Sequence, residues 1–135
     1  MKKIKNQKGF TLTELVVVIV IIGILAGTLI PTFRHYLINA RSSANYQEAL
    51  DVRRVMMMAY EAHYVYEYEN EAGEVVSKQM NSFDSFVDLD LNEFYYDYTG
   101  IELDADVNFE DDMLTYYKRN IEVALNVYTL EYHLQ

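Results

Sequence analysis

The stretch that decides the fold lies near the N-terminus, where residues 10–30 read FTLTELVVVIVIIGILAGTLI. Glu14 is the only charged residue in these 21 positions. As an α-helix the stretch would be about 31 Å long, close to the roughly 30 Å thickness of the hydrocarbon core of a bilayer. We therefore predict an N-terminal helix that is long and apolar enough to cross a membrane.

The charges on either side of this stretch predict its orientation. Four lysines lie in the eight residues before it, namely Lys2, Lys3, Lys5 and Lys8. The first cations after it are Arg34 and Arg41. Because positively charged flanks stay preferentially in the cytoplasm, we expect a cytoplasmic N-terminus and an external C-terminal part.

The junction between the polar leader and the apolar run carries a specific pattern. Residues 8–14 read KGFTLTE, and the Val/Ile/Leu run that follows contains Gly23 and is followed by Pro31. Over residues 1–60 this resembles the precursor N-terminus of type IV pilins and of the related pseudopilins. The resemblance implies that a prepilin peptidase cleaves after Gly9 and that the new N-terminal residue, Phe10, is methylated.

Glu14 needs an explanation, because a carboxylate near the centre of a bilayer costs about 2.5 to 3.5 kcal/mol. The resemblance implies that Glu14 pairs with the new amine of Phe10, on its own or a neighbouring subunit, and sets the register of assembly. Thr11 and Glu14 also have the spacing of a capping box, which satisfies N–H groups at a helix start. We favour the assembly role, and the two roles are compatible.

Gly23, Gly27 and Pro31 recur every four residues. Two glycines and a proline reduce helix preference by on the order of 5 kcal/mol relative to alanine. The resemblance implies that the helix unwinds locally between Gly23 and Pro31 inside a filament. Close helix packing through Gly23 and Gly27 is the alternative.

The helix is expected to continue past Pro31 as an amphipathic segment over residues 32–62. Apolar residues recur there at intervals of mostly three or four, namely Phe33, Leu37, Ala40, Ala44, Ala49, Val52, Met56 and Ala59. We place the end near Ala62 rather than at Gly73, because Tyr64, Tyr66 and Tyr68 alternate with the period of a strand. Met56 to Met58 are interpreted as adaptable filler between helix and sheet.

The C-terminal part is predicted to form a small antiparallel sheet. Residues 121–129 alternate between apolar and polar, and residues 113–118 could pair with them across Arg119 and Asn120. A helix beginning at Met113 is the rival interpretation, since the spacing of Leu114, Tyr117, Ile121 and Leu125 is also helical. The enrichment in Val, Tyr and Thr favours strands.

Composition excludes several functions. The chain has a net charge of -10, and from Glu61 onward 18 acidic residues face 3 basic ones, a balance of -15. This excess would repel a phosphate backbone, so no nucleic-acid binding by the head is expected. There is no cysteine, and no motif of a nucleophilic, nucleotide-binding or metal-dependent enzyme occurs. We expect no enzymatic activity.

One acidic segment resembles part of a calcium loop. It carries Asp104, Asp106, Asn108, Glu110 and Asp112 at every second position. Phe109 stands where such a loop needs glycine, and Thr115 stands where it needs glutamate. Asp88, Asp90 and Asn92 repeat the spacing. Calcium is the one candidate cofactor, and a solvated acidic edge is the alternative interpretation.

Two surface features have more than one interpretation. Arg53 and Arg54 are the last basic residues before the acidic head, so they are either partners for carboxylates of a neighbouring subunit or part of a solvated helix face. The chain has 13 tyrosines. They suit subunit packing or adhesion, or they form a core that lacks tryptophan.

Together these patterns predict an α+β subunit in which a long N-terminal helix packs on a small antiparallel sheet. Its parts are a leader (1–9), a transmembrane or filament-core helix (10–31), an amphipathic continuation (32–62) and an acidic head (63–135). The resemblance implies a subunit that waits in the membrane and then polymerises with itself and other pilins into an extracellular fibre. It also implies a membrane platform and an assembly ATPase as partners.

Two other functions fit the same sequence. The first is a minor pseudopilin of a secretion or DNA-uptake apparatus. The second is a single-pass membrane anchor with an acidic binding head, and Gly9-Phe10 argues against it. Whether the fibre serves motility, adhesion, secretion or DNA uptake does not follow from the sequence.

Overall fold

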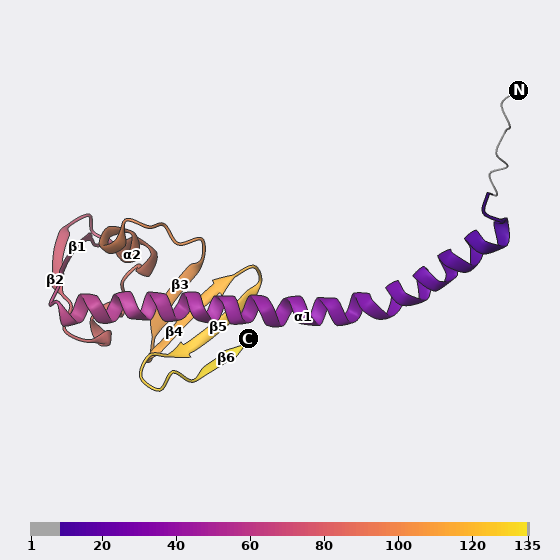
Figure 1. The fold of residues 1–135 in the computed structure, drawn as a ribbon. Helices are drawn as coiled ribbons and strands as arrows, with labels where there is room; N and C mark the ends of the chain where they lie inside the picture. The colour runs from indigo at the N-terminus through magenta and orange to yellow at the C-terminus, as the bar shows by residue number, and fades with distance from the viewer. Residues whose placement is uncertain (1–8, 135) are drawn as a thin grey trace, which may run out of the picture. The chain divides into compact units, whose positions relative to one another are not determined.

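The computed structural model describes residues 9–134 of the chain (Figure 1). One long helix comes first and a mixed region of short elements follows, so the predicted α+β class is confirmed. The elements are α1 (Leu12–Glu61), β1 (Val65–Glu69), β2 (Val75–Gln79), the 3₁₀ turn η1 (Phe83–Phe86), α2 (Leu91–Thr99), β3 (Asp106–Glu110), β4 (Met113–Lys118), β5 (Ile121–Asn126) and β6 (Tyr132–Leu134). The four leader lysines, Lys2, Lys3, Lys5 and Lys8, lie outside the described residues.

The structure divides into two compact units, the first ending at Leu37 and the second beginning at Ile38. The amphipathic part of α1 therefore belongs mostly to the unit that contains the head. The predicted division at residues 31 and 32 falls six residues earlier.

In the first unit α1 runs as a regular helix with Pro31 inside it. None of its residues from Leu12 to Leu37 is buried. A Cβ added at Gly23 or at Gly27 would meet no atom within 4 Å, so packing within the chain does not require either glycine. Among the described residues, α1 is the one helix that is long and apolar enough to cross a membrane.

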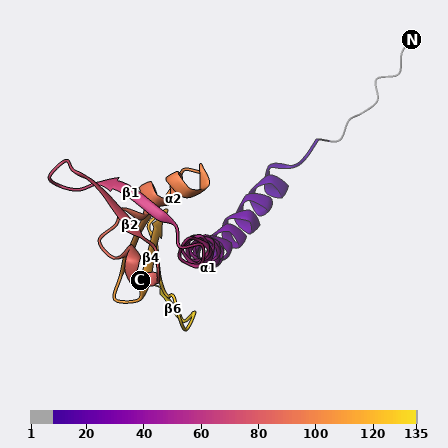
Figure 2. The same ribbon diagram turned by 90° about the vertical axis from the view of Figure 1, so that its left-hand side faces the viewer.

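In the second unit one face of α1 packs on the sheet. The buried residues on this face are Ser42, Asn45, Ala49, Val52, Val55, Met56 and Ala59. The five apolar ones share a core with residues of β3, β4 and β5 such as Phe109, Leu114 and Leu125. Figure 2 looks along this part of the helix, and the strands and α2 lie to one side of it. Met56 is fully buried and Met57 packs against the core, as the filler interpretation expects, whereas Met58 is 45% exposed and does not fill the core.

Strands β3, β4, β5 and β6 form an antiparallel meander in chain order. Lys118 pairs with Ile121, so the β4–β5 connection has two residues, Arg119 and Asn120, with φ of 55° and 60°. Positive φ at both positions is the requirement of a type I′ hairpin turn. The predicted hairpin is confirmed and the rival helix from Met113 is wrong, because β-rich residues flank a tight turn.

The α1 end near Ala62 is also confirmed. The helix stops at Glu61, His63 has a φ of 50°, and the N–H of Tyr64 donates to the Ala59 carbonyl at 2.9 Å. The chain then enters β1, where Tyr66 is buried and its neighbours are exposed.

Helix α2 was not predicted. Asp90 is its N-cap, and its carboxylate accepts from the N–H groups of Asn92 and Glu93. Gly100, with a φ of 73°, ends the helix. Asp90 and Asn92, interpreted as part of an acidic edge or calcium motif, are therefore a helix start signal.

Candidate assembly site at the start of α1

The predicted cleavage position lies in an accessible part of the chain. Gly9 and Phe10 are exposed and precede the first helical residue, and the Phe10 side chain is 92% exposed. Because a peptidase must bind its substrate outside regular structure, this placement suits cleavage between Gly9 and Phe10.

Thr11 and Glu14 form the capping box that their spacing predicts. The Thr11 N–H donates to Oε2 of Glu14 at 2.8 Å, and the Glu14 N–H donates to Oγ1 of Thr11 at 3.3 Å. The N–H groups of Thr11 and Glu14 therefore both have partners within the chain. The capping alternative is confirmed in this geometry, and the assembly role of Glu14 stays a prediction.

Phe10 and Glu14 line the same hollow on the helix surface, together with Thr13, Leu15, Val17 and Val18. Glu14 is the only acidic residue between residues 9 and 37. Cleavage after Gly9 would give Phe10 an ammonium group beside this hollow. The arrangement can then bring a cation and a carboxylate together in apolar surroundings, where their attraction is strong.

The rest of the first unit presents apolar side chains to its surroundings. Most of its large apolar side chains are half-exposed or more, among them Leu15, Val20, Ile24, Leu29 and Phe33. Contiguous exposed apolar surface of this extent marks contact with lipid or with other protein. Nothing else within the described chain covers it.

In the head, α1 and β4 are joined by a small polar cluster. The Tyr116 hydroxyl donates to the Glu48 carboxylate, and Lys118 Nζ lies 2.9 Å from Oε2 of Glu48. Burial alone would raise the pKa of Glu48, but the hydrogen bonds from Tyr116 and Lys118 and the charge of Lys118 outweigh it, and the pKa is lowered. Burial, with the bond to Glu48, raises the pKa of Tyr116. The cluster ties the helix to the sheet.

Asn45 is a second tie between α1 and the sheet. Its side chain is fully buried, and Nδ2 donates to the carbonyls of Lys118 and Ile121 at 3.0 Å each. These carbonyls flank the β4–β5 turn. Sequence reasoning passed over Asn45, although a polar residue within an apolar stripe was the available signal.

The adjacent arginines Arg53 and Arg54 of α1 make different contacts. Arg53 Nε donates to the Val127 carbonyl at 2.5 Å, and its guanidinium lies 5.6 Å from the centre of the Phe83 ring. Arg54 is exposed and pairs with Asp51 at 2.7 Å. Arg53 therefore stabilises its own head, which leaves Arg54 as the more accessible of the two for a neighbour.

The acidic segment of the calcium hypothesis lies on and around β3. Asp106 and Glu110 are exposed, whereas Phe109 between them is buried, so the alternation is that of a strand with one face in the core. Asp104 lies 3.9 Å from Lys118. Among residues 9–134, no group of three or more Asp, Glu, His or Cys residues is placed to hold a metal. Calcium binding by Asp104, Asp106, Asn108 and Asp112 stays a prediction.

Comparison with known proteins defines the class of the N-terminal segment. Residues 4–30 match the family model of the prokaryotic N-terminal methylation motif. The N-terminal segment of this chain therefore carries that motif and is similar to the N-terminal segment of a type IV pilin, as its sequence indicated.

The chain is also similar to a particular protein of known name. The chain is 37% identical over 67 residues to the type IV major pilin protein PilE1 of Neisseria gonorrhoeae. The matched stretch is 50% of this chain and 31% of that relative, so the chain matches about a third of the relative's length. No solved structure matches the chain.

Proposed function

We propose that the chain is a structural subunit of a type IV pilus-like filament, held in the membrane by the first half of α1 and then polymerised through it. The observation that carries the proposal is the combination at the helix start. An exposed Gly9-Phe10 bond lies close to Glu14, the only carboxylate between residues 9 and 37, in an apolar stretch of helix where no residue is buried.

The proposed route has three steps. Cleavage after Gly9 creates the amine of Phe10, and methylation follows. The subunit then waits in the bilayer with its N-terminus toward the cytoplasm and its acidic head outside. The attraction between Glu14 of one subunit and Phe10 of a neighbour sets the axial register as the assembly machinery lifts the subunit from the membrane.

The similarity to PilE1 favours a pilus over a pseudopilus, because PilE1 is a type IV major pilin. The glycines support a role for the helix in the fibre. Neither Gly23 nor Gly27 is required by a contact within the chain, so both fit close approach of neighbouring helices or local unwinding before Pro31.

A charge-specific substitution tests the register. Glutamine at position 14 keeps the capping box, since Gln replaces Glu in that motif, but it removes the charge. Glu14→Gln is expected to abolish or strongly reduce fibres recovered by shearing, with membrane insertion unchanged. Thr11→Ala is the matched control, because it removes one capping bond and leaves the carboxylate. Normal fibres from Glu14→Gln, or equal loss from both variants, would contradict the register mechanism.

A further inference from the structure

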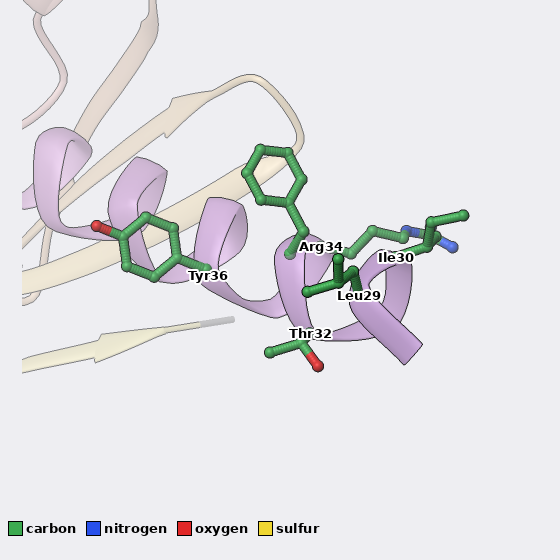
Figure 3. A pocket seen from close by; sticks show the side chains of 6 residues that line it. Leu29, Ile30, Thr32, Arg34 and Tyr36 are labelled. Atoms are coloured by element: carbon green, nitrogen blue, oxygen red, sulfur yellow. The ribbon is translucent and has the colours of Figure 1, made fainter. Parts of the chain in front are cut away.

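The end of the first unit carries exposed aromatic side chains and an arginine, which the proposed assembly mechanism leaves without a role. Phe33 and Tyr36 are 61% and 70% exposed. They line one open hollow on the helix with Arg34, and the other lining residues are Leu29, Ile30 and Thr32 (Figure 3). Apolar side chains thus give way within two turns to a guanidinium and a phenol.

The position of these residues follows from helix geometry. If residues 10–30 fill the hydrocarbon core, Arg34 lies about 6 Å beyond it, at 1.5 Å per residue. The headgroup layer on each side of a bilayer is roughly 5 to 7 Å thick. Arg34 therefore falls within the headgroup layer, and Arg41, about 16 Å beyond the core, falls outside it.

The polar groups just before this point are satisfied within the helix. The Thr28 hydroxyl donates to the Leu25 carbonyl at 3.0 Å, and the Thr32 hydroxyl donates to the Thr28 carbonyl at 3.2 Å. Pro31 has no N–H, so the Gly27 carbonyl lacks its usual helical donor. This unpaired carbonyl lies within one helical turn of the expected membrane surface, where water can hydrogen-bond to it.

Arg34 needs an anionic partner. It is the only lysine or arginine between residues 9 and 37, and the described part of the chain gives it no ion pair. The helix of a second copy in the same register offers no carboxylate nearby, since the nearest in sequence, Glu48, lies fourteen residues away, about 21 Å along α1. A lipid phosphate offers two oxygens at the right depth, and guanidinium binds phosphate through paired hydrogen bonds.

Resting on the membrane stage of the proposed function, we propose that Arg34 binds the phosphate of a lipid headgroup on the outer face of the membrane, with Phe33 and Tyr36 at the same depth. The rings of Phe33 and Tyr36 suit the interface, where aromatic residues collect. The contact fixes the depth of the waiting subunit. It is released when the assembly machinery lifts the helix from the lipid.

Solid-state NMR of the full chain in phosphatidylglycerol bilayers tests this site. The guanidinium carbons of the five arginines are labelled with ¹³C, and loss of their signal through coupling to ³¹P is measured. About one fifth of the arginine signal should be dephased. Arg34→Lys should abolish this dephasing, whereas the matched variant Arg41→Lys should keep it.

A depth measurement and an insertion control complete the test. Tyr36→Trp should be quenched most by a nitroxide on the lipid headgroup and less by one at mid-chain. Resistance to alkaline extraction reports insertion separately. An inserted chain with no dephasing, or with dephasing that persists in Arg34→Lys, overturns the phosphate site and leaves the membrane stage standing. A chain that fails to insert overturns both.

Discussion

The two halves of α1 use one helix in opposite ways. No residue from Leu12 to Leu37 is buried, although this half is by far the more apolar. Seven residues of the second half are buried, and Ser42 and Asn45 are among them. Apolar content therefore does not identify the core of this protein. The first half has no cover within the described chain and suits lipid or other subunits, whereas the second half has a stripe that matches its own sheet.

The largest contrast is expected from removing buried volume in the second half. Met56 is fully buried, so Met56→Ala should destabilise the head by about 2 to 5 kcal/mol. Denaturant unfolding of the full chain in detergent, followed by tyrosine fluorescence, measures the change. Met58→Ala, at a neighbouring 45% exposed position, and Val20→Ala, in the first half, should each leave head stability nearly unchanged. A comparable loss of head stability in Val20→Ala would show that the first half of α1 also contributes to the stability of the head.

Removing the buried amide should have a smaller effect. Asn45→Ala leaves the carbonyls of Lys118 and Ile121 without their donor, which costs about 1 to 3 kcal/mol. The same unfolding measurement applies, and Gln47→Ala on the exposed side of the helix is the control. If Asn45→Ala unfolds like the control, the amide does not hold the β4–β5 turn to α1.

The smallest effect is a pH dependence of the head. The folded pKa of Glu48 is lowered, so its contribution is present above the unfolded value of 4.5 and is lost as the pH falls through the folded value. Because the Glu48 side chain is 39% exposed, about 0.2 to 1 kcal/mol is expected. The raised pKa of Tyr116 gives a contribution that is present below pH 10 and lost at higher pH.

Melting curves between pH 3 and pH 7 measure the acid limb. Glu48→Gln should flatten it, whereas Asp51→Asn, in the exposed pair with Arg54, should change it less. An unchanged acid limb in Glu48→Gln would assign the pH dependence to other carboxylates of the head.

Much of the fold could be predicted, because its signals are local. The long apolar start of α1, its end near Ala62 and the β4–β5 hairpin each depend on residues adjacent in the sequence. The features that were missed depend on distant partners or on one capping residue. The role of Asn45 was missed because the carbonyls that it binds lie 73 and 76 positions away in the sequence. Helix α2 was hidden because Asp90 was interpreted by charge and not as a cap. The spacing of Asp106, Asn108 and Glu110 similarly reflects the period of a strand.

The central claim is that the first half of α1 is a processed assembly segment. Mass spectrometry of the N-terminus of protein recovered from the native host tests it most directly. The account predicts a chain that begins at Phe10 and carries one added methyl group. An intact Met1 would contradict the account and indicate a plain membrane anchor, and cleavage beyond Ile30 would contradict it in favour of an ordinary secreted protein.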